Sequence, residues 1–139
     1  MAGYSGTPLA KKLGFKEGFR AGFVNPPTGF QKELDPLPDN LEIIVGRFPK
    51  QLDLIILFTD SQRTLKREFK KLARKLARNG MLWIAWPKKA AGVATDLSEN
   101  HVRQIGLEAG LVDVKVCAVN DIWSGLKFVY RLQDRILRE

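Results

Sequence analysis

The sequence contains one stretch that decides the fold, Leu52-Asp53-Leu54-Ile55-Ile56-Leu57-Phe58-Thr59. This run is almost wholly apolar, has the length of one strand and is followed at once by Asp60 and Ser61, residue types that commonly cap a helix. A strand that is apolar on both faces is typical of a parallel sheet covered by helices on both sides. The stretch therefore predicts an α/β protein built on a central parallel sheet.

A long helix is predicted directly downstream, from Ser61 to Arg78. Its apolar residues recur at spacings of four, three and four, which places them on one face: Leu65, Phe69, Leu72 and Leu76. Asn79-Gly80 is a typical helix-ending pair, and the apolar run Met81–Trp86 that follows predicts a second buried strand. Strand, helix and strand in this order form one unit of a parallel sheet.

Further strands are predicted on both sides of this unit, at Phe19–Val24, Leu41–Val45, Val112–Val119 and Leu126–Leu132. Between them, Asp96 and Glu99 stand three residues apart in a capping-box pattern that begins another helix. The residues between the last two strands, 120–125, form a hairpin turn. Together these elements predict a three-layer Rossmann-like (methyltransferase-like) α/β fold, with a mostly parallel sheet of about six strands that ends in an antiparallel hairpin.

Length and composition fit one such domain over residues 1–139, in which residues 1–16 are an N-terminal segment with a short helix. Cys117 is the only cysteine, so it cannot form an intramolecular disulfide, and its apolar surroundings predict a buried core residue. The chain shows no signal-peptide pattern and no apolar run of membrane-spanning length, which predicts a cytoplasmic protein without a membrane partner. The sequence leaves open the oligomeric state and whether Gly3–Thr7 closes over a site as a lid.

The positive charge of the chain is concentrated in one segment. The formal net charge is +8, and Ser61–Arg78 alone holds eight basic residues against one acid, a net charge of +7. Such a helix can lie along the phosphates of a nucleic acid, with the candidate residues Arg63, Arg67, Lys70 and Arg74. The same pattern also fits an ordinary solvated surface helix, and it offers no exposed aromatic residue for stacking on single-stranded bases.

Several motifs give the chain a family resemblance. They are spread along its whole length, at Tyr4–Gly14, Leu82–Lys89, Gly92–Leu97, Val112–Val119 and Trp123–Lys127. On these motifs the chain resembles the domain-of-unknown-function 3052 family of short bacterial cytosolic proteins, and the resemblance implies no activity because none is known for that family. More distantly, the predicted sheet is similar to that of class I methyltransferases with one strand–helix unit missing. That similarity concerns the fold and does not by itself imply methyl transfer.

Polar and aromatic residues gather where the predicted parallel strands end, at the edge of the sheet where open α/β folds bind ligands. We expect a ligand site there, with the candidate residues Asn25, Thr59, Asp60, Trp86, Lys88, Lys89, Thr95 and Asp96. In Trp86-Pro87-Lys88-Lys89 an aromatic plane precedes two ammonium groups, a combination that suits a planar or phosphorylated molecule. The alternative is structural, with Trp86 packed in the core, the two lysines solvated and Asp96 only capping a helix.

The loop after the first strand bears on the choice of cofactor. Nucleotide and adenosyl cofactors are held by glycine-rich loops, whereas Asn25–Gly29 contains one glycine and two prolines that lack an N–H. Gly46-Arg47 also stands where an acidic residue for a ribose is expected. The sequence therefore argues against NAD and S-adenosylmethionine and predicts no cofactor. His101 has no cysteine or second histidine beside it, so no metal site is predicted.

Three functions remain open at this point. The first is a non-catalytic, degenerate Rossmann-like module that binds an anionic small molecule or a protein partner at the carboxyl edge of the sheet. The second is a small enzyme for a phosphorylated or carboxylated substrate, with Lys88 or Lys89 as electrostatic stabiliser and Asp60 or Asp96 as base. The third is nucleic-acid binding through the basic helix. The sequence favours the first, because no acid–base pair stands out.

Overall fold

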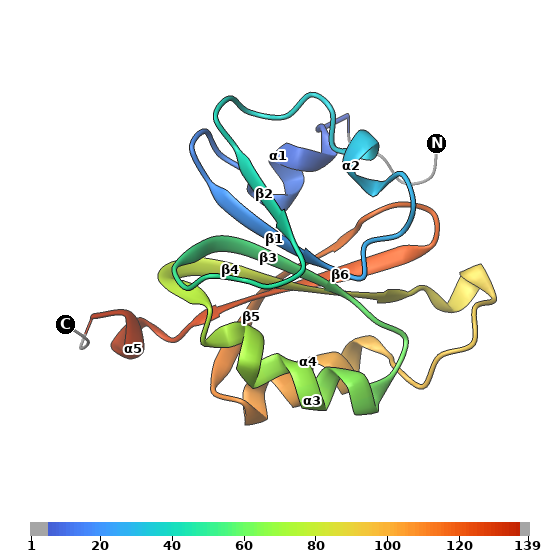
Figure 1. The fold of residues 1–139 in the computed structure, drawn as a ribbon. Helices are drawn as coiled ribbons and strands as arrows, with labels where there is room; N and C mark the ends of the chain where they lie inside the picture. Colours follow the sequence, from blue (N-terminus) through green and yellow to red (C-terminus); the bar gives the residue numbers. More distant parts are fainter. Residues whose placement is uncertain (1–5, 137–139) are drawn as a thin grey trace.

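Six strands pair into one sheet in the order β2-β1-β3-β4-β6-β5 (Figure 1). The structure is a computed structural model that describes residues 6–136. The strands are β1 (Arg20–Val24), β2 (Glu42–Val45), β3 (Leu52–Phe58), β4 (Leu76–Pro87), β5 (Leu111–Ala118) and β6 (Trp123–Tyr130). The helices are α1 (Leu9–Leu13), α2 (Phe30–Glu33), α3 (Gln62–Ala73), the 3-10 turn η1 (Lys89–Ala91), α4 (Glu99–Glu108) and α5 (Leu132–Ile136). Strands β1 to β4 are parallel and β5 and β6 form an antiparallel hairpin, which confirms the predicted fold.

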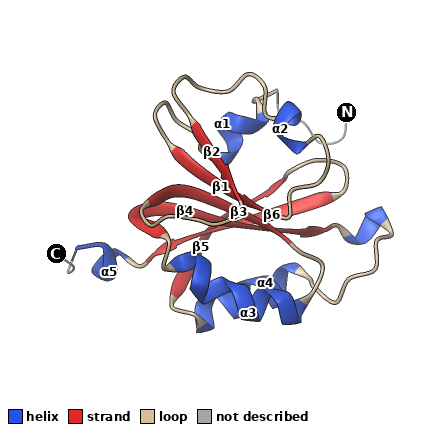
Figure 2. Cartoon of the chain, in the orientation of Figure 1, coloured by secondary structure: helices blue, strands red, loops and turns tan. Residues whose placement is uncertain are grey.

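The sheet is the middle of three layers, with α1 and α2 on one face and α3 and α4 on the other (Figure 2). The central strand β3 shows why both faces are covered. Ile55 and Leu57 pack in the core under α3 and α4. Leu54, Ile56 and Phe58 point the other way, into the core under α1 and α2. All five side chains are at most 1% exposed, as expected for a strand that is apolar on both faces.

Helix α3 is shorter than predicted and β4 is longer. The helix ends at Ala73, five residues earlier than expected, and β4 begins at Leu76. Leu76 continues the helical spacing of the apolar stripe, but it pairs with Leu52 of β3 and is buried in the α3/α4 core as a strand residue. Gly80 does not end the helix, because it lies within β4, where a Cβ would sit 2.9 Å from the Leu52 carbonyl oxygen. Strand pairing therefore overrides the local helical pattern at this point.

Two loops also differ from the prediction. Strand β6 begins at Trp123, inside the predicted turn. The Asn120 side chain accepts hydrogen bonds from the N–H groups of Ile122 and Trp123, both at 2.9 Å, and so closes a shorter loop. Helix α4 is capped by Ser98, whose Oγ accepts a hydrogen bond from the His101 N–H at 3.3 Å.

The N-terminal helix α1 is attached to the middle of the sheet. Trp83 of β4 is 1% exposed, and its Nε1 donates a hydrogen bond of 2.8 Å to the carbonyl oxygen of Leu13 at the end of α1. Gly14 follows with φ 94°, the left-handed conformation that ends many helices. This contact fixes where α1 lies on the sheet and, with it, one wall of the site described next.

Candidate functional site

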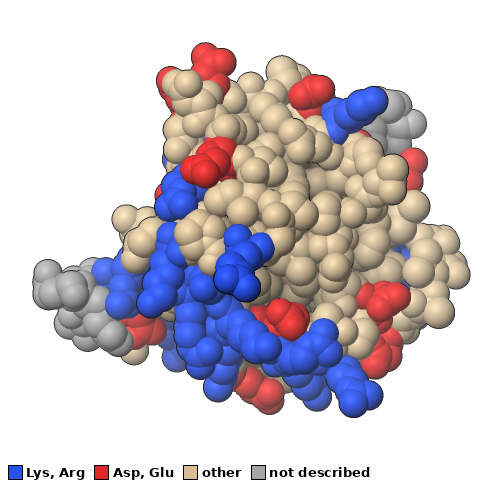
Figure 3. All heavy atoms as spheres, viewed as in Figure 1, with Lys and Arg blue, Asp and Glu red and all other residues tan. Residues whose placement is uncertain are grey.

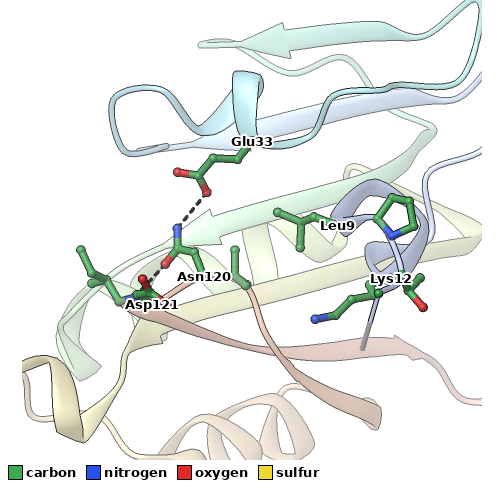
Figure 4. A pocket seen from close by; sticks show the side chains of 10 residues that line it. Leu9, Lys12, Glu33, Asn120 and Asp121 are labelled. Carbon is green, nitrogen blue, oxygen red and sulfur yellow. Dashed lines mark hydrogen bonds between the residues drawn. The ribbon is translucent and has the colours of Figure 1, made fainter. Parts of the chain in front are cut away.

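A pocket opens between the start of α1, the end of α2 and the loop of the β5–β6 hairpin (Figure 4). Its volume is about 620 Å³, within the range typical of small-molecule sites. It is lined by Gly6, Thr7, Pro8, Leu9, Lys12, Glu33, Val119, Asn120, Asp121 and Ile122. Three segments that are far apart in the sequence therefore build this pocket.

Hydrogen bonds between α1 and β5 hold two of these segments against each other. Nζ of Lys12 donates to the carbonyl oxygen of Ala118 at 3.2 Å. In the opposite direction, Nζ of Lys115 donates to the carbonyl oxygen of Lys12 at 3.0 Å. Because Ala118 directly precedes the hairpin loop, this reciprocal pair keeps the loop opposite the start of α1.

The hairpin loop also places the pocket beside the carboxyl ends of the parallel strands. Pro87 at the end of β4 pairs with Trp123, and the Lys88 N–H donates to the Ile122 carbonyl oxygen at 2.7 Å. The Trp123 ring packs edge-to-face on Phe58 at the end of β3, with ring centroids 5.2 Å apart. The pocket therefore lies at the edge where open α/β sheets bind ligands.

Charged groups stand on opposite sides of the pocket (Figure 4). Glu33 of α2 accepts a hydrogen bond from Nδ2 of Asn120 at 3.0 Å, and Asp121 follows in the same loop. Lys12 lies across from them, with the apolar side chain of Leu9 between. Two carboxylates thus face one ammonium group over an apolar surface, an arrangement that suits a ligand carrying charges of both signs.

Further lysines surround the Lys12 side of the pocket. Lys115 and Lys127 are cross-strand neighbours on the hairpin, and the pKa of Lys127 is lowered by burial and by the positive charge of Lys115. Cys117 lies among these amines and is only partly buried, contrary to the expectation of a core residue, because β5 is an edge strand. Burial raises the pKa of its thiol, while Lys12, Lys115 and Lys127 act in the opposite direction. Three lysines, Lys12, Lys115 and Lys127, therefore lie close to Cys117 on the α1 side of the hairpin.

Four sequence-predicted site residues come together at the start of α3, namely Thr59, Asp60, Thr95 and Asp96. Oγ1 of Thr95 donates a hydrogen bond of 2.7 Å to the carbonyl oxygen of Asp60. The Asp96 carboxylate accepts from the Gln62 N–H at 2.8 Å. Asp96 therefore caps α3 and not α4, contrary to its capping-box spacing. In this structure the hydrogen bonds of the group connect the loop before α4 to α3.

The other four predicted residues, Asn25, Trp86, Lys88 and Lys89, do not line the pocket. Trp86 is 5% exposed and belongs to the core under α3 and α4. Lys89 is exposed in η1, Lys88 is partly exposed just before it, and Asn25 is exposed after β1 with φ 55°. The residues that line the pocket within the described range 6–136 include none of the eight predicted residues.

The sequence did not predict the pocket residues, because each belongs to a local pattern that needs no functional explanation. Gly6–Leu9 is typical of a helix start, and residues 119–122 are typical of a hairpin turn. One signal was present, since two motifs of the family resemblance, Tyr4–Gly14 and Val112–Val119, each supply part of the lining. Whether Gly3–Thr7 forms a lid falls largely outside the described residues.

The strand order, the two helical layers and the site at the carboxyl edge define a protein of the Rossmann-like methyltransferase fold. Comparisons with solved structures agree. A SAM-dependent methyltransferase from Aquifex aeolicus matches with a TM-score of 0.60 and 18% identity, and 86% of each chain is covered. At this level of identity the similarity establishes the fold alone.

Two further structures extend the comparison to the cofactor. Magnesium protoporphyrin IX methyltransferase from Synechocystis PCC 6803, solved with bound SAH, matches with a TM-score of 0.58 and 11% identity over 88% of this chain and 78% of that one. Fibrillarin from Aeropyrum pernix, solved with natively bound S-adenosyl-L-methionine, matches with a TM-score of 0.57 and 14% identity over 91% and 70%. No protein-family model matches the chain, and no curated protein sequence matches it either. The resemblance to the 3052 family therefore stays a hypothesis.

These comparisons correct the expectation about the cofactor. The sequence argued against S-adenosylmethionine because the loop after β1 holds one glycine and two prolines, and because Gly46-Arg47 stands where an acidic residue was expected. Proteins of this same fold were nevertheless solved with S-adenosyl compounds bound. Both sequence observations concern short local segments, and the fold that the chain shares with these proteins is compatible with an S-adenosyl cofactor in spite of them.

Within residues 6–136 no three His, Cys, Asp or Glu side chains gather as a metal site. No helix in that range combines the length and apolar character of a membrane span.

Proposed function

We propose that this protein binds S-adenosylmethionine, or a closely related zwitterionic metabolite, in the pocket between α1, α2 and the hairpin loop. The proposal is carried by the pocket itself, a volume of about 620 Å³ at the carboxyl edge with opposite charges on its two sides. It is supported by the fold, which the chain shares with SAM-dependent methyltransferases.

The charges of the pocket match those of this ligand. S-adenosylmethionine carries a sulfonium and an ammonium group together with one carboxylate, and its adenine ring presents a flat, largely apolar face. Glu33 and Asp121 can face the cationic groups, and Lys12 can face the carboxylate. Leu9 and Ile122 provide apolar surface for the ring. A buried charge needs such a partner, since an unpaired one is costly to remove from water.

The pocket is a better place for the ligand than the loop after β1. Pro26 and Pro27 in that loop offer no N–H donors, and α2, which follows, is only four residues long. In the pocket, by contrast, donors and acceptors are side chains that the fold already holds in place, as the 3.0 Å contact between Asn120 and Glu33 illustrates.

Calorimetric titration of the protein with S-adenosylmethionine tests the proposal. We expect Lys12→Met and Glu33→Gln each to weaken binding by about tenfold to a hundredfold, because each removes a charge-assisted contact worth about 1.5–3 kcal/mol. Glu33→Gln keeps an oxygen for Asn120, so it removes the charge without removing the internal hydrogen bond. Lys89→Ala is the matched control, since Lys89 is exposed on the same edge but outside the pocket.

The outcomes are distinct. Loss of binding in Lys89→Ala but not in the two pocket variants would contradict the pocket and favour the strand-end site expected from the sequence. Absence of any heat change with S-adenosylmethionine and S-adenosylhomocysteine would contradict the proposed ligand. If binding is present, incubation with S-adenosylmethionine and candidate methyl acceptors distinguishes an enzyme from a binding module. Formation of S-adenosylhomocysteine identifies an enzyme, and an intact bound cofactor identifies a binding module.

A further inference from the structure

The exposed face of α3 is almost purely basic. At 100° per residue, its six outward Lys and Arg side chains fall within an arc of about 140°. They are Arg63, Lys66, Arg67, Lys70, Lys71 and Arg74, and all six are exposed. Leu65, Phe69 and Leu72 occupy the opposite arc and are buried against the sheet. The six cations therefore form one continuous stripe along the helix, which we call the basic stripe.

The basic stripe is largely uncompensated. Among the described residues, only Arg67 of the stripe is paired with a carboxylate, that of Glu68 at 3.0 Å. In Figure 3 the blue atoms of Lys and Arg form a band over α3 that continues toward the C-terminal end of the chain. The six cations of the stripe together with Glu68 carry a net charge of +5, out of +8 for the whole sequence, so most of the net positive charge lies on this surface.

Folding also separates the stripe from basic residues that serve another purpose. Nη1 of Arg78, which the sequence placed on the same helix, donates 2.8 Å to the carbonyl oxygen of Asp134, and its guanidinium lies 5.9 Å from the centroid of the Tyr130 ring. Arg78 therefore connects β4 to the C-terminal segment. Within residues 6–136 no side chain of the stripe forms a hydrogen bond to another helix or strand, and so many like charges side by side lower stability.

The chemistry of the stripe indicates its partner. Residues four apart along the stripe form two rows, one of Arg63, Arg67 and Lys71 and one of Lys66, Lys70 and Arg74. These rows follow a 12-residue helix of roughly 18 Å, and such a series of cations suits the regularly spaced phosphates of a duplex. No aromatic side chain is exposed on α3 for stacking on single-stranded bases, since Phe69 is 1% exposed. The exposed face of α3 also has no apolar side chain to insert into a lipid surface, which a membrane-binding helix needs.

We infer that α3 is a docking surface for the phosphodiester backbone of double-stranded nucleic acid, which it binds without sequence preference through the basic stripe. This inference does not depend on the ligand proposed for the pocket. The two sites lie on different faces of the sheet, since the pocket is bounded by α1 and α2 and the stripe lies on α3.

Fluorescence anisotropy with labelled 20-base-pair duplexes of DNA and of RNA tests the inference. For each kind of nucleic acid, two duplexes of unrelated sequence are compared. We expect the protein to bind both with equal affinity. The plot of log K against log salt concentration should have a slope of about −5 if all six cations meet phosphates. The variant Arg67→Glu/Lys70→Glu/Arg74→Glu should lose on the order of a hundredfold or more in affinity at 50 mM salt.

The matched control is Lys11→Glu/Lys16→Glu/Lys32→Glu. It changes the net charge by the same amount at three exposed lysines outside α3. Circular dichroism establishes that both triple variants are folded. Retained affinity in the control and its loss in the α3 variant support the inference. Equal loss in both variants, a strong preference for one sequence, or binding only to phosphatidylserine vesicles and to neither duplex would overturn it.

Discussion

At Gly106 of α4 the packing leaves no room for a side chain. A Cβ at this position would overlap the ring of Phe128, which is fully buried on β6 and packs edge-to-face on Phe69 of α3. Glycine is otherwise unfavourable in the interior of a helix by about 1 kcal/mol relative to alanine. Its presence in α4 is therefore explained by the close approach of α4 to β6.

We expect Gly106→Ala to destabilise the protein by about 2 kcal/mol, in spite of the better helix propensity of alanine. We expect the overpacking cost of about 1–3 kcal/mol to exceed this gain, because the Phe128 ring is fully buried and packs against Phe69. Urea unfolding measures the change as a shift of the midpoint at constant m-value. In the double variant with Phe128→Leu the two effects should partly cancel, and strictly additive losses would show that the two residues are not in conflict.

Helix α3 shows how the caps of an element can come from outside it. Its first turn is satisfied by Ser61, whose Oγ accepts from the Thr64 N–H at 3.1 Å, and by Asp96, which lies 34 residues downstream and accepts from Gln62. The carboxylate also stands at the positive end of the helix dipole. One loop residue thereby fixes the loop before α4 to the start of α3.

We expect Ser61→Ala and Asp96→Ala each to lower the free energy of unfolding by about 1 kcal/mol, the usual value of an N-cap contact. Glu99→Gln is the control, because Glu99 is the residue that the capping-box pattern pairs with Asp96. In the structure it only forms an exposed ion pair with Arg103 at 2.6 Å, so its loss should cost less than about 0.5 kcal/mol. A larger cost for Glu99→Gln than for Asp96→Ala would contradict the observed capping.

The elements themselves were largely predictable from the sequence, because hydrophobic period and capping residues act locally. Leu52–Phe58 was recognised within one residue, since a strand buried on both faces has a distinctive composition. The end of α3 was not, because Leu76 fits the helical spacing and only its pairing with Leu52 makes it a strand residue. Boundaries set by tertiary contacts do not appear in a local pattern.

At the scale of the whole molecule, two cores share one sheet. Trp86 belongs to the core under α3 and α4, whereas Trp83 and Trp123 lie on the side of α1 and α2. Both cores include side chains of β3, so loss of packing on one face of the sheet is expected to weaken the other. We therefore expect the described residues 6–136 to unfold in one cooperative transition.

Variants that keep one tryptophan test this cooperativity. We expect Trp83→Phe/Trp123→Phe, which reports on Trp86, to show the same unfolding midpoint by fluorescence and by far-ultraviolet circular dichroism. The same coincidence is expected for Trp86→Phe/Trp123→Phe, which reports on Trp83. The fluorescence and dichroism midpoints are compared within the same variant, so a change in stability caused by the substitutions shifts both midpoints together. A fluorescence transition that precedes the dichroism transition would reveal one face that unfolds on its own.

The candidate site was much less predictable than the fold. The sequence placed the site at the carboxyl edge of the sheet, and the pocket does lie there, but its walls come from segments with no chemical signature of their own. Lys12 and Asp121 become neighbours of one cavity only because α1 is attached to β4 and the hairpin bends back over the same edge. Proximity between such distant segments is a property of the completed fold.

The contact between Lys12 and Ala118 spans 106 residues, and it has a consequence for synthesis on the ribosome. The first wall of the pocket leaves the ribosome long before the second has been translated. During that interval the nascent chain exposes α1 without Trp83, Ala118 or the hairpin loop to hold it. A ligand in the cell can therefore bind this site only after nearly all strands of the sheet have left the ribosome. A ribosome that stalls before the hairpin produces a chain without the pocket.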